Sequence, residues 1–223
     1  MLRKILIATP AYGGNVCSAY TESLLYTCML LSQNNIQFEL KFINNQLVTR
    51  ARNMLSSLFM DNESFTHMIF IDADVVWAPE NVLMLIEHDL ECVIGIYPNK
   101  AYKWVGNKLI LEPSSKVDLV NQNMSTPSPN LIRIKHGATG FMLLKKSALL
   151  RIQKDVETFI LPGSTGDPII LYNYFDCKVV DNDYLTEDYY FSHLFNNNGG
   201  IIYADTRIKL RHIGAHEYGE LVQ

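Results

Sequence analysis

Short apolar runs alternate with longer amphipathic segments through residues 1–100. Residues 36–43 alternate strictly between apolar and polar side chains, a period that predicts a half-exposed β-strand. Residues 46–60 predict a helix whose apolar face holds Leu47, Ala51, Met54, Leu55 and Leu58, with Arg50, Arg52 and Asn53 elsewhere on the wheel. By the same criteria we expect strands at residues 4–8, 67–71 and 92–97, and helices at 16–32 and 79–89.

The second half of the chain is less regular. We expect strands at residues 108–112, 131–136, 141–144, 201–204 and 208–212, and an aromatic helix at 185–196. Strands that alternate with helices predict an α/β protein with a largely parallel sheet, whose ligands bind beyond the carboxyl ends of the strands. Three such ends carry conspicuous residues: Thr9 to Tyr12, Asp72 to Asp74, and Tyr97 to Lys100. We therefore expect one crevice to collect them.

Composition narrows the functional classes. Of the 223 residues, 48% are hydrophobic and 19% are charged, so the chain can bury a core and wholesale disorder is excluded. The formal charge of −4 argues against general nucleic-acid binding, which needs a basic surface. No apolar run approaches the roughly 20 residues of a transmembrane helix, and the four cysteines form no C-x-x-C pair. These features favour one cytoplasmic domain without a membrane span.

Paired carboxylates follow the strand expected at residues 67–71. Asp72 and Asp74 lie two residues apart, so in an extended backbone both side chains point the same way. Two close carboxylates repel each other and stay ionised most easily beside a cation, and hard oxygen ligands suit Mg²⁺ or Mn²⁺. The alternative is an acidic turn that caps the helix expected at 79–89. We favour the metal site, because an apolar strand leads directly into the pair.

Two other segments carry acids or a histidine. Glu187 and Asp188 open the aromatic helix, either as ordinary first-turn acids or with one carboxylate that acts as a general base. His212 lies near the end of a predicted strand, where it is either a packed histidine or a metal ligand.

Glycine and arginine supply the remaining candidates. Gly137 and Gly140 provide either a tight turn or a close approach of a substrate to the backbone. Arg50 and Arg52 are either a solvated helix face or partners of a phosphate or of the aspartates.

Taken in order, these segments resemble the metal-dependent glycosyltransferases of the GT-A fold. The corresponding segments are residues 5–12, Ala51-Arg52-Asn53, Asp72-Ala73-Asp74, the glycine-rich residues 137–140, Thr186-Glu187-Asp188 and the late His212. The resemblance covers about residues 3–214 and implies a Rossmann-like, three-layer α/β/α fold with a mostly parallel central sheet. It also implies one catalytic domain over residues 1–223, with a nucleotide-sugar-binding half at about 1–100 and an acceptor-side half at about 101–223.

The resemblance further implies an activity. A sugar is transferred from a nucleoside-diphosphate sugar, with a UDP-sugar as the favoured donor, to a hydroxyl of a glycan or glycoconjugate. The reaction inverts the configuration at the anomeric carbon of the sugar. The resemblance implies that Mn²⁺ (or Mg²⁺) is held by Asp72, Asp74 and His212, and that Asp188 is the general base with Glu187 in support. It also implies that the donor is contacted by Thr9, Pro10, Tyr12, Arg52, Asp72, Gly137 and Gly140. The compact chain is similar to soluble bacterial enzymes or to those of large DNA viruses, which act in the host cytoplasm.

Two other functions stay open. Residues 71–75 (Ile-Asp-Ala-Asp-Val) also fit the first motif of phosphatases of the haloacid dehalogenase type, in which the first aspartate is a nucleophile. In this chain two or three strands precede the pair, and the late acidic motif of that family is missing. The other alternative is a binding module for nucleotide sugars that has lost its chemistry.

Overall fold

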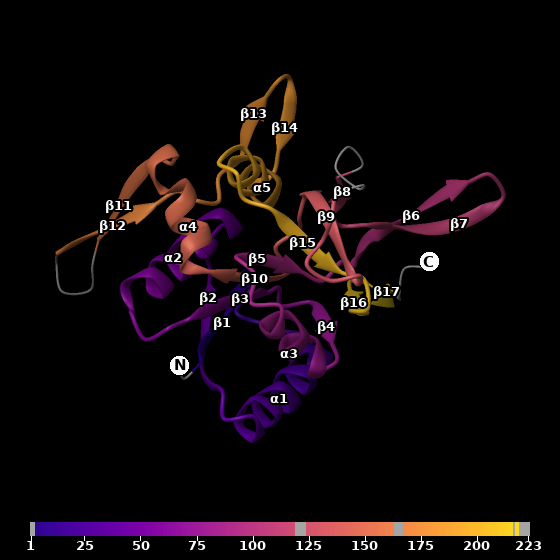
Figure 1. Ribbon diagram of the computed structural model, residues 1–223, viewed down its shortest axis with the longest axis horizontal. Helices are drawn as coiled ribbons and strands as arrows, with labels where there is room; N and C mark the ends of the chain where they lie inside the picture. The colour runs from indigo at the N-terminus through magenta and orange to yellow at the C-terminus, as the bar shows by residue number, and fades with distance from the viewer. Residues whose placement is uncertain (1–2, 119–123, 163–166, 216, 219–223) are drawn as a thin grey trace.

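The computed structural model describes residues 3–118, 124–162, 167–215 and 217–218 (Figure 1). Its centre is an eight-stranded sheet. In spatial order the strands are β2 (Gln37–Asn44), β1 (Lys4–Ala11), β3 (His67–Ile71), β10 (Phe141–Lys145), β5 (Cys92–Ile94), β15 (Ile202–Asp205), β9 (Leu131–His136) and β8 (Lys116–Val117).

Most strands of this sheet point in one direction. β1 pairs in parallel with β2 and β3, and β15 pairs in parallel with β5. β10 runs antiparallel to both of its neighbours, β3 and β5, and β9 runs antiparallel to β15 and β8. Six of the eight strands therefore share a direction, and only β10 and β9 are reversed. The expected α/β class with a mostly parallel central sheet is confirmed.

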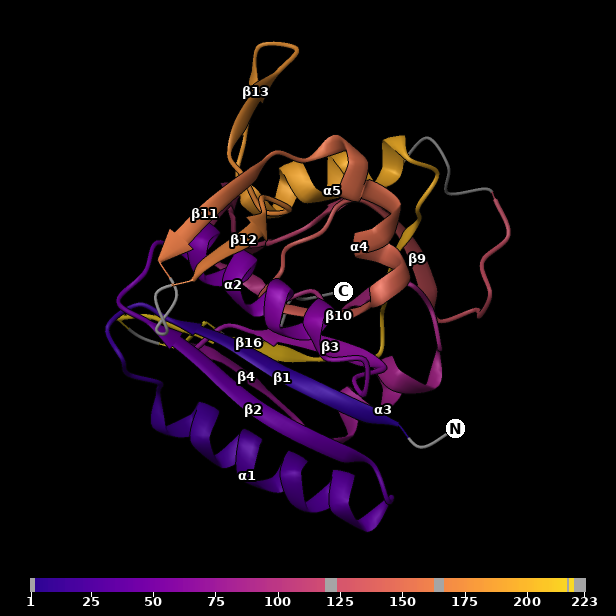
Figure 2. The same ribbon diagram turned by 90° about the vertical axis from the view of Figure 1, so that its left-hand side faces the viewer.

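Helices cover both faces of the sheet, which gives three layers (Figure 2). Because successive side chains of a strand point to opposite faces, Leu6 and Phe70 pack with the helices of one face, whereas Ile5 and Ile69 pack with those of the other. The first face is covered by α2 (Val48–Asp61), α4 (Lys146–Ile152) and α5 (Glu187–Asn197), and the second by α1 (Ser18–Gln33) and α3 (Glu80–Glu87).

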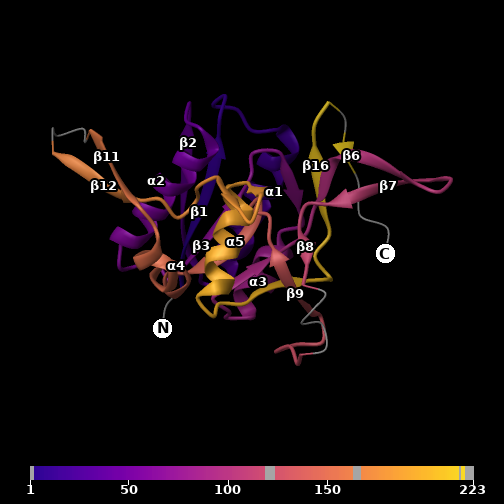
Figure 3. The same cartoon turned by 90° about the horizontal axis from the view of Figure 1, so that it is seen from above.

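Smaller sheets lie outside this core. Two hairpins, β6 (Pro98–Val105) with β7 (Lys108–Pro113) and β11 (Thr158–Pro162) with β12 (Pro168–Tyr172), project from opposite sides of the molecule (Figures 1 and 3). A third hairpin joins β13 (Lys178–Val180) to β14 (Asp183–Leu185) and leads into α5. A three-stranded sheet is formed by β17 (Glu217–Tyr218), β16 (Leu210–Ile213) and β4 (Val75–Trp77).

The structure corrects the expected orientation of the helix at residues 46–60. The helix forms as α2, and Ala51 and Leu55 are buried as predicted. Leu47 and Leu58, which were expected on the buried face, are exposed, while Arg52 and Asn53 are buried. Polar contacts, described below, hold these two side chains inside the protein, and such contacts leave no trace in a hydrophobic pattern.

Other differences concern the bounds of elements. The strand expected at 92–97 ends at Ile94. The next residue, Gly95, has no room for a side chain, since a Cβ there would lie within 2.9 Å of Ile208, Leu210 and Phe141. The helix α4, the short 3₁₀ turn Gln153–Asp155 and the β11–β12 and β13–β14 hairpins were not predicted.

Candidate active site

A cleft of about 640 Å³ opens beyond the carboxyl ends of β1 and β3. Of the predicted site residues, the cleft brings together Pro10, Tyr12, Asp72, Asp74 and His212. Gln46, Leu47, Val48, Ala73 and Lys100 complete its lining. This is the edge of the sheet at which α/β proteins bind their ligands.

Arg52 joins two acids that are far apart in sequence. Its guanidinium Nη2 donates to Asp72 Oδ1 at 2.9 Å, and its Nε lies 3.5 Å from Glu187 Oε1. Arg52 is only 2% exposed and packs on the face of the Phe70 ring, with 5.3 Å between the guanidinium carbon and the ring centroid. The solvated-face alternative is therefore wrong for Arg52, although it holds for the exposed Arg50.

The neighbouring Asn53 has a different task. Its side-chain amide donates to Asn173 Oδ1 and to the Phe175 carbonyl, and its Oδ1 accepts from the Phe175 backbone N–H at 2.9 Å. These bonds fix the segment between β12 and β13 against α2. Sequence reasoning assigned no role to Asn53.

Asp74 faces a histidine and a lysine. His212 Nε2 lies 3.3 Å from Asp74 Oδ1, and the Lys100 ammonium is bonded to Asp74 Oδ2. Burial raises the pKa of Asp74, but the bonds with His212 and Lys100 outweigh burial and hold the pKa below its usual value. Asp74 is therefore a carboxylate at neutral pH.

Strand pairing brings His212 to this position. After Asp72 the chain turns, with Val75 N–H donating to the Asp72 carbonyl, and enters β4. β16 pairs antiparallel with β4 so that His212 lies opposite Val75, and the Ile213 N–H donates to the Asp74 carbonyl at 2.8 Å. Residues 138 positions apart (212 − 74) thus meet through backbone pairing.

The protonation of His212 shows what this pair requires. His212 Nδ1 lies 2.9 Å from the Pro98 carbonyl, which can only accept, so Nδ1 carries a proton. In a neutral imidazole Nε2 then carries a lone pair, and this lone pair faces the negatively charged Asp74 Oδ1. Nε2 can bond to Asp74 only when it also carries a proton. Without that proton, its lone pair and the carboxylate oxygen are both available to a divalent metal ion.

The predicted metal triad is not formed in full. Within the described residues, no group of three His, Cys, Asp or Glu side chains is placed to hold a metal ion, since Asp72 is turned toward Arg52. One carboxylate can still serve, because Mg²⁺ is usually bound through one or two carboxylates together with substrate phosphates. Asp74, with His212 beside it, would hold such an ion when a phosphate ligand completes its coordination.

Asp188 lies at the start of α5, beside the Arg52–Glu187 pair. Its Oδ1 accepts from the Tyr189 backbone N–H at 2.8 Å and from the Thr186 hydroxyl. Burial raises the pKa of Asp188, and the adjacent Glu187 adds to this effect. A carboxylate with a raised pKa is a better proton acceptor near neutral pH. The bonds to Thr186 and Tyr189 also agree with the alternative in which Asp188 stabilises the helix start.

The two predicted glycines lie in different surroundings. Gly140 touches the site: a Cβ there comes within 2.4 Å of the Tyr97 hydroxyl and 2.7 Å of Asp72 Oδ2. The Gly140 N–H donates to the Tyr97 hydroxyl and its carbonyl accepts from the Asp72 N–H. Gly137 instead faces Ile202 and Ile94 in the core, and its N–H donates to Ser192. Only Gly140 therefore contacts the other site residues.

The loop after β1 is split between core and cleft. Thr9 is buried, and its hydroxyl shares a hydrogen bond of 2.5 Å with the Tyr20 hydroxyl on α1. Pro10 and the exposed Tyr12 line the cleft. Thr9 thus holds the strand end against α1, while Tyr12 is open to a ligand.

The segment from Tyr97 to Lys100 was expected at this crevice, but sequence reasoning assigned no role to Tyr97 or to Lys100. Lys100 contacts Asp74, and Tyr97 lies against Gly140 and stacks edge-on against His212 with 5.1 Å between the ring centroids. Burial raises the pKa of Tyr97 well above its usual value, and the charges of Asp72 and Asp188 add to this. The signal was present in part, because residues 97–100 follow a strand of the parallel set.

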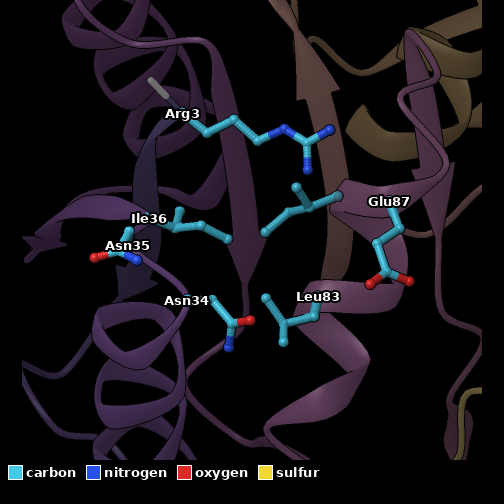
Figure 4. Close-up of a pocket in the computed structure, with 7 residues that line it drawn as sticks. Arg3, Asn34, Asn35, Ile36, Leu83 and Glu87 are labelled. Carbon is cyan, nitrogen blue, oxygen red and sulfur yellow. The ribbon is translucent and has the colours of Figure 1, made fainter. Parts of the chain in front are cut away.

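A second cavity, of about 430 Å³, lies at the opposite end of the strands (Figure 4). Its lining combines the polar Arg3, Asn34, Asn35 and Glu87 with the apolar Ile36 and Leu83. Its lining contains none of the predicted site residues. The carboxyl-end cleft is therefore the candidate active site.

Comparisons with known proteins agree with this architecture. No protein-family model matches the sequence, and no curated protein matches it. The crystal structure of A197 from STIV has a TM-score of 0.51 at 16% identity, over 96% of this chain and 86% of that one. The structure of GalNAc-T7 with UDP, GalNAc and Mn²⁺ has a TM-score of 0.48 at 8% identity, over 96% of this chain and 44% of that one. The structure of S. aureus TarS 1–349 in complex with UDP-GlcNAc has a TM-score of 0.44 at 14% identity, over 92% of this chain and 56% of that one. The likeness to A197 shows a common fold, whereas the two weaker matches establish none.

The helices of the described residues do not meet the requirements for crossing a membrane. None of them combines the length and the apolar character needed to cross a bilayer.

Proposed function

We propose that this chain is a glycosyltransferase of the GT-A type, which moves a sugar from a nucleoside-diphosphate sugar to an acceptor hydroxyl. One observation carries the proposal: the cleft at the carboxyl ends of β1 and β3 gathers Asp72, Asp74 and His212, and Arg52 ties this cleft to the acids that open α5. The donor-binding residues belong mainly to residues 1–100, and residues 101–223 supply the acceptor side.

The donor fits the charge of the cleft. A nucleoside diphosphate is anionic, whereas the chain carries a net charge of −4 and the cleft contains two aspartates. A divalent ion on Asp74 and His212 supplies Lewis-acid neutralisation of the diphosphate leaving group. Tyr12 is exposed at the rim, where its ring is available to stack on the nucleoside base, with UDP as the favoured donor.

The acceptor needs a base, and Asp188 is the best candidate. A hydroxyl becomes a good nucleophile when a positioned carboxylate takes its proton, which typically contributes ~10²–10⁴-fold in rate. Arg52 holds Glu187, the preceding residue, and thereby fixes the start of α5. Asp188 then acts on the acceptor, while Asp74 and His212 act on the donor. The acceptor attacks from the side opposite the leaving group, which inverts the configuration at the anomeric carbon.

The test separates these two tasks. Asp188→Asn is expected to lower the release of UDP from a UDP-sugar in the presence of Mn²⁺ by ~10²-fold or more while calorimetry shows an unchanged UDP affinity. Asp74→Asn is expected to abolish the Mn²⁺-dependent part of UDP binding. Asp183→Asn, an exposed substitution on β14, is the matched control and changes neither quantity.

The same measurements decide between this proposal and its rivals. Near-normal turnover in Asp188→Asn returns that carboxylate to a helix-start role. Donor binding without any turnover indicates a binding module. Covalent phosphorylation of Asp72 from a phosphate ester indicates a phosphatase, although the bond from Arg52 to Asp72 Oδ1 opposes a nucleophilic role for this residue.

A further inference from the structure

Lys100 reaches the cleft from an irregular stretch of β6. The pairing of β6 with β7 shifts in register between Pro98 and Tyr102, so β6 carries extra residues there. Such bulges re-aim side chains and are frequent beside active sites. The shifted stretch brings the Lys100 ammonium onto Asp74, and the Pro98 carbonyl at its start accepts a hydrogen bond from His212 Nδ1. The same short segment thus contacts both partners of Asp74.

Lys100 is bonded to the carboxylate that a metal ion would need. Its ammonium neutralises Asp74 at Oδ2, while His212 Nε2 lies 3.3 Å from the other oxygen, Oδ1. A divalent ion bound to Asp74 would lie close to that ammonium, and like charges so close would repel each other strongly. Lys100 and the metal therefore compete for Asp74.

We propose that Lys100 is an exchangeable counter-ion of Asp74. It neutralises the carboxylate while the metal is absent, and it turns to the diphosphate of the donor when the metal replaces it. This inference rests on the proposed function and adds a donor-binding residue to it.

The surroundings of Lys100 support the exchange. About a third of its side chain (35%) is exposed, and so is 39% of the Asp74 side chain, so breaking the pair does not strand a charge in the core. Lysine has a long flexible stem that can redirect its charge. Among the described residues that line the cleft, Lys100 is the only lysine or arginine, since Arg52 lies behind Asp72. Lys100 is therefore the cationic side chain of the cleft lining that can contact an anionic donor.

Lys100→Met is expected to change two affinities in opposite directions. Binding of Mn²⁺ alone tightens by about twofold to fivefold, as removal of a partly exposed ion pair predicts. Binding of UDP at saturating Mn²⁺ weakens by about tenfold, because a charge-assisted contact with phosphate is lost. Lys103→Met is the matched control: Lys103 lies on the same strand, its ammonium is 2.9 Å from Glu112, and it does not line the cleft.

The experiment titrates metal-free protein with Mn²⁺ and follows free Mn²⁺ by electron paramagnetic resonance, and then titrates UDP by calorimetry. Tighter Mn²⁺ and weaker UDP binding in Lys100→Met, with no change in Lys103→Met, support the exchange. Unchanged or weaker Mn²⁺ binding in Lys100→Met, when wild type binds Mn²⁺ normally, overturns the exchange alone. Wild-type protein that binds no Mn²⁺ overturns the metal in the proposed function and the exchange with it.

Discussion

Replacement of Arg52 by methionine tests whether one buried cation holds the two halves of the site together. Methionine keeps an unbranched apolar stem that reaches about as far as the arginine Nε, but it removes the charge and the donors to Asp72 and Glu187. Both carboxylates then remain where they are without their shared partner. We expect the fold to lose stability and α5 to lose its fixed start.

The size of the loss follows from burial. The side chain of Arg52 is 3% exposed, while those of Asp72 and Glu187 are 25% and 14% exposed. Removing one partner of a buried ion pair costs about 3–5 kcal/mol, since the other charge is left uncompensated. Because water still reaches Asp72, we expect the lower end, about 3 kcal/mol. In a chain of 223 residues this corresponds to a fall of roughly 6–12 °C in melting temperature.

The assay is urea unfolding at neutral pH, with Arg50→Met as the control on the exposed face of the same helix. The control is expected to change the free energy of unfolding by less than about 0.5 kcal/mol. Adding Glu187→Gln to Arg52→Met is expected to restore at least about 1 kcal/mol, because it removes one of the two stranded charges. Equal effects of the two arginine substitutions, or no recovery in the double variant, would refute the coupling of α2 to α5 through Arg52.

Two further substitutions test the packing around the site and the pH dependence of stability. Gly140→Ala is expected to weaken Mn²⁺-dependent UDP binding at least about tenfold in a calorimetric titration, because the new Cβ displaces the Tyr97 hydroxyl and Asp72. Gly13→Ala is the control in the same titration, since a Cβ at Gly13 meets nothing closer than 3.7 Å. Asp205 is buried, and bonds from Arg207 and His88 outweigh burial and lower its pKa to about 2. Its folded pKa lies below the unfolded value of about 3.9, so its contribution is complete above pH 4 and is lost as the pH falls through 2. Asp205→Asn is therefore expected to cost about 2 kcal/mol in urea unfolding at pH 7 and almost nothing at pH 2, and an equal cost at both pH values would contradict this.

The sequence predicted the layered core because the core follows simple periodicities. The strands at β1, β3 and β10 are continuous apolar runs, and a strand buried between two helical layers needs apolar side chains on both faces. The direction of β10 was not predictable in this way, because a buried strand shows the same pattern whether it runs parallel or antiparallel. The projecting hairpin β11–β12 escaped for a different reason: it exposes Ile160 and Ile170, so its apolar residues do not mark a core.

The candidate site was predictable where chemistry is local in the sequence. Asp72 and Asp74 follow their strand directly, and the resemblance added His212, which the structure places in the same cleft. The partners of these acids were harder to see. Arg52 looks like a surface arginine in a helical wheel, and Lys100 depends on a bulge that no periodicity encodes. Both contacts are decided by tertiary geometry.

The two cation partners also explain why the two aspartates should differ. Asp72 is paired with a buried arginine, and breaking that pair costs about 3 kcal/mol or more by the reasoning above. Asp74 is paired with a partly exposed lysine, whose ion pair is worth at most about 1 kcal/mol. An incoming metal ion therefore displaces Lys100 far more easily than Arg52, so it is expected to enter at Asp74 beside His212. Asp72 then keeps its bond to Arg52 and acts by positioning the acids of α5, which makes the paired carboxylates unequal in function although they are adjacent in sequence.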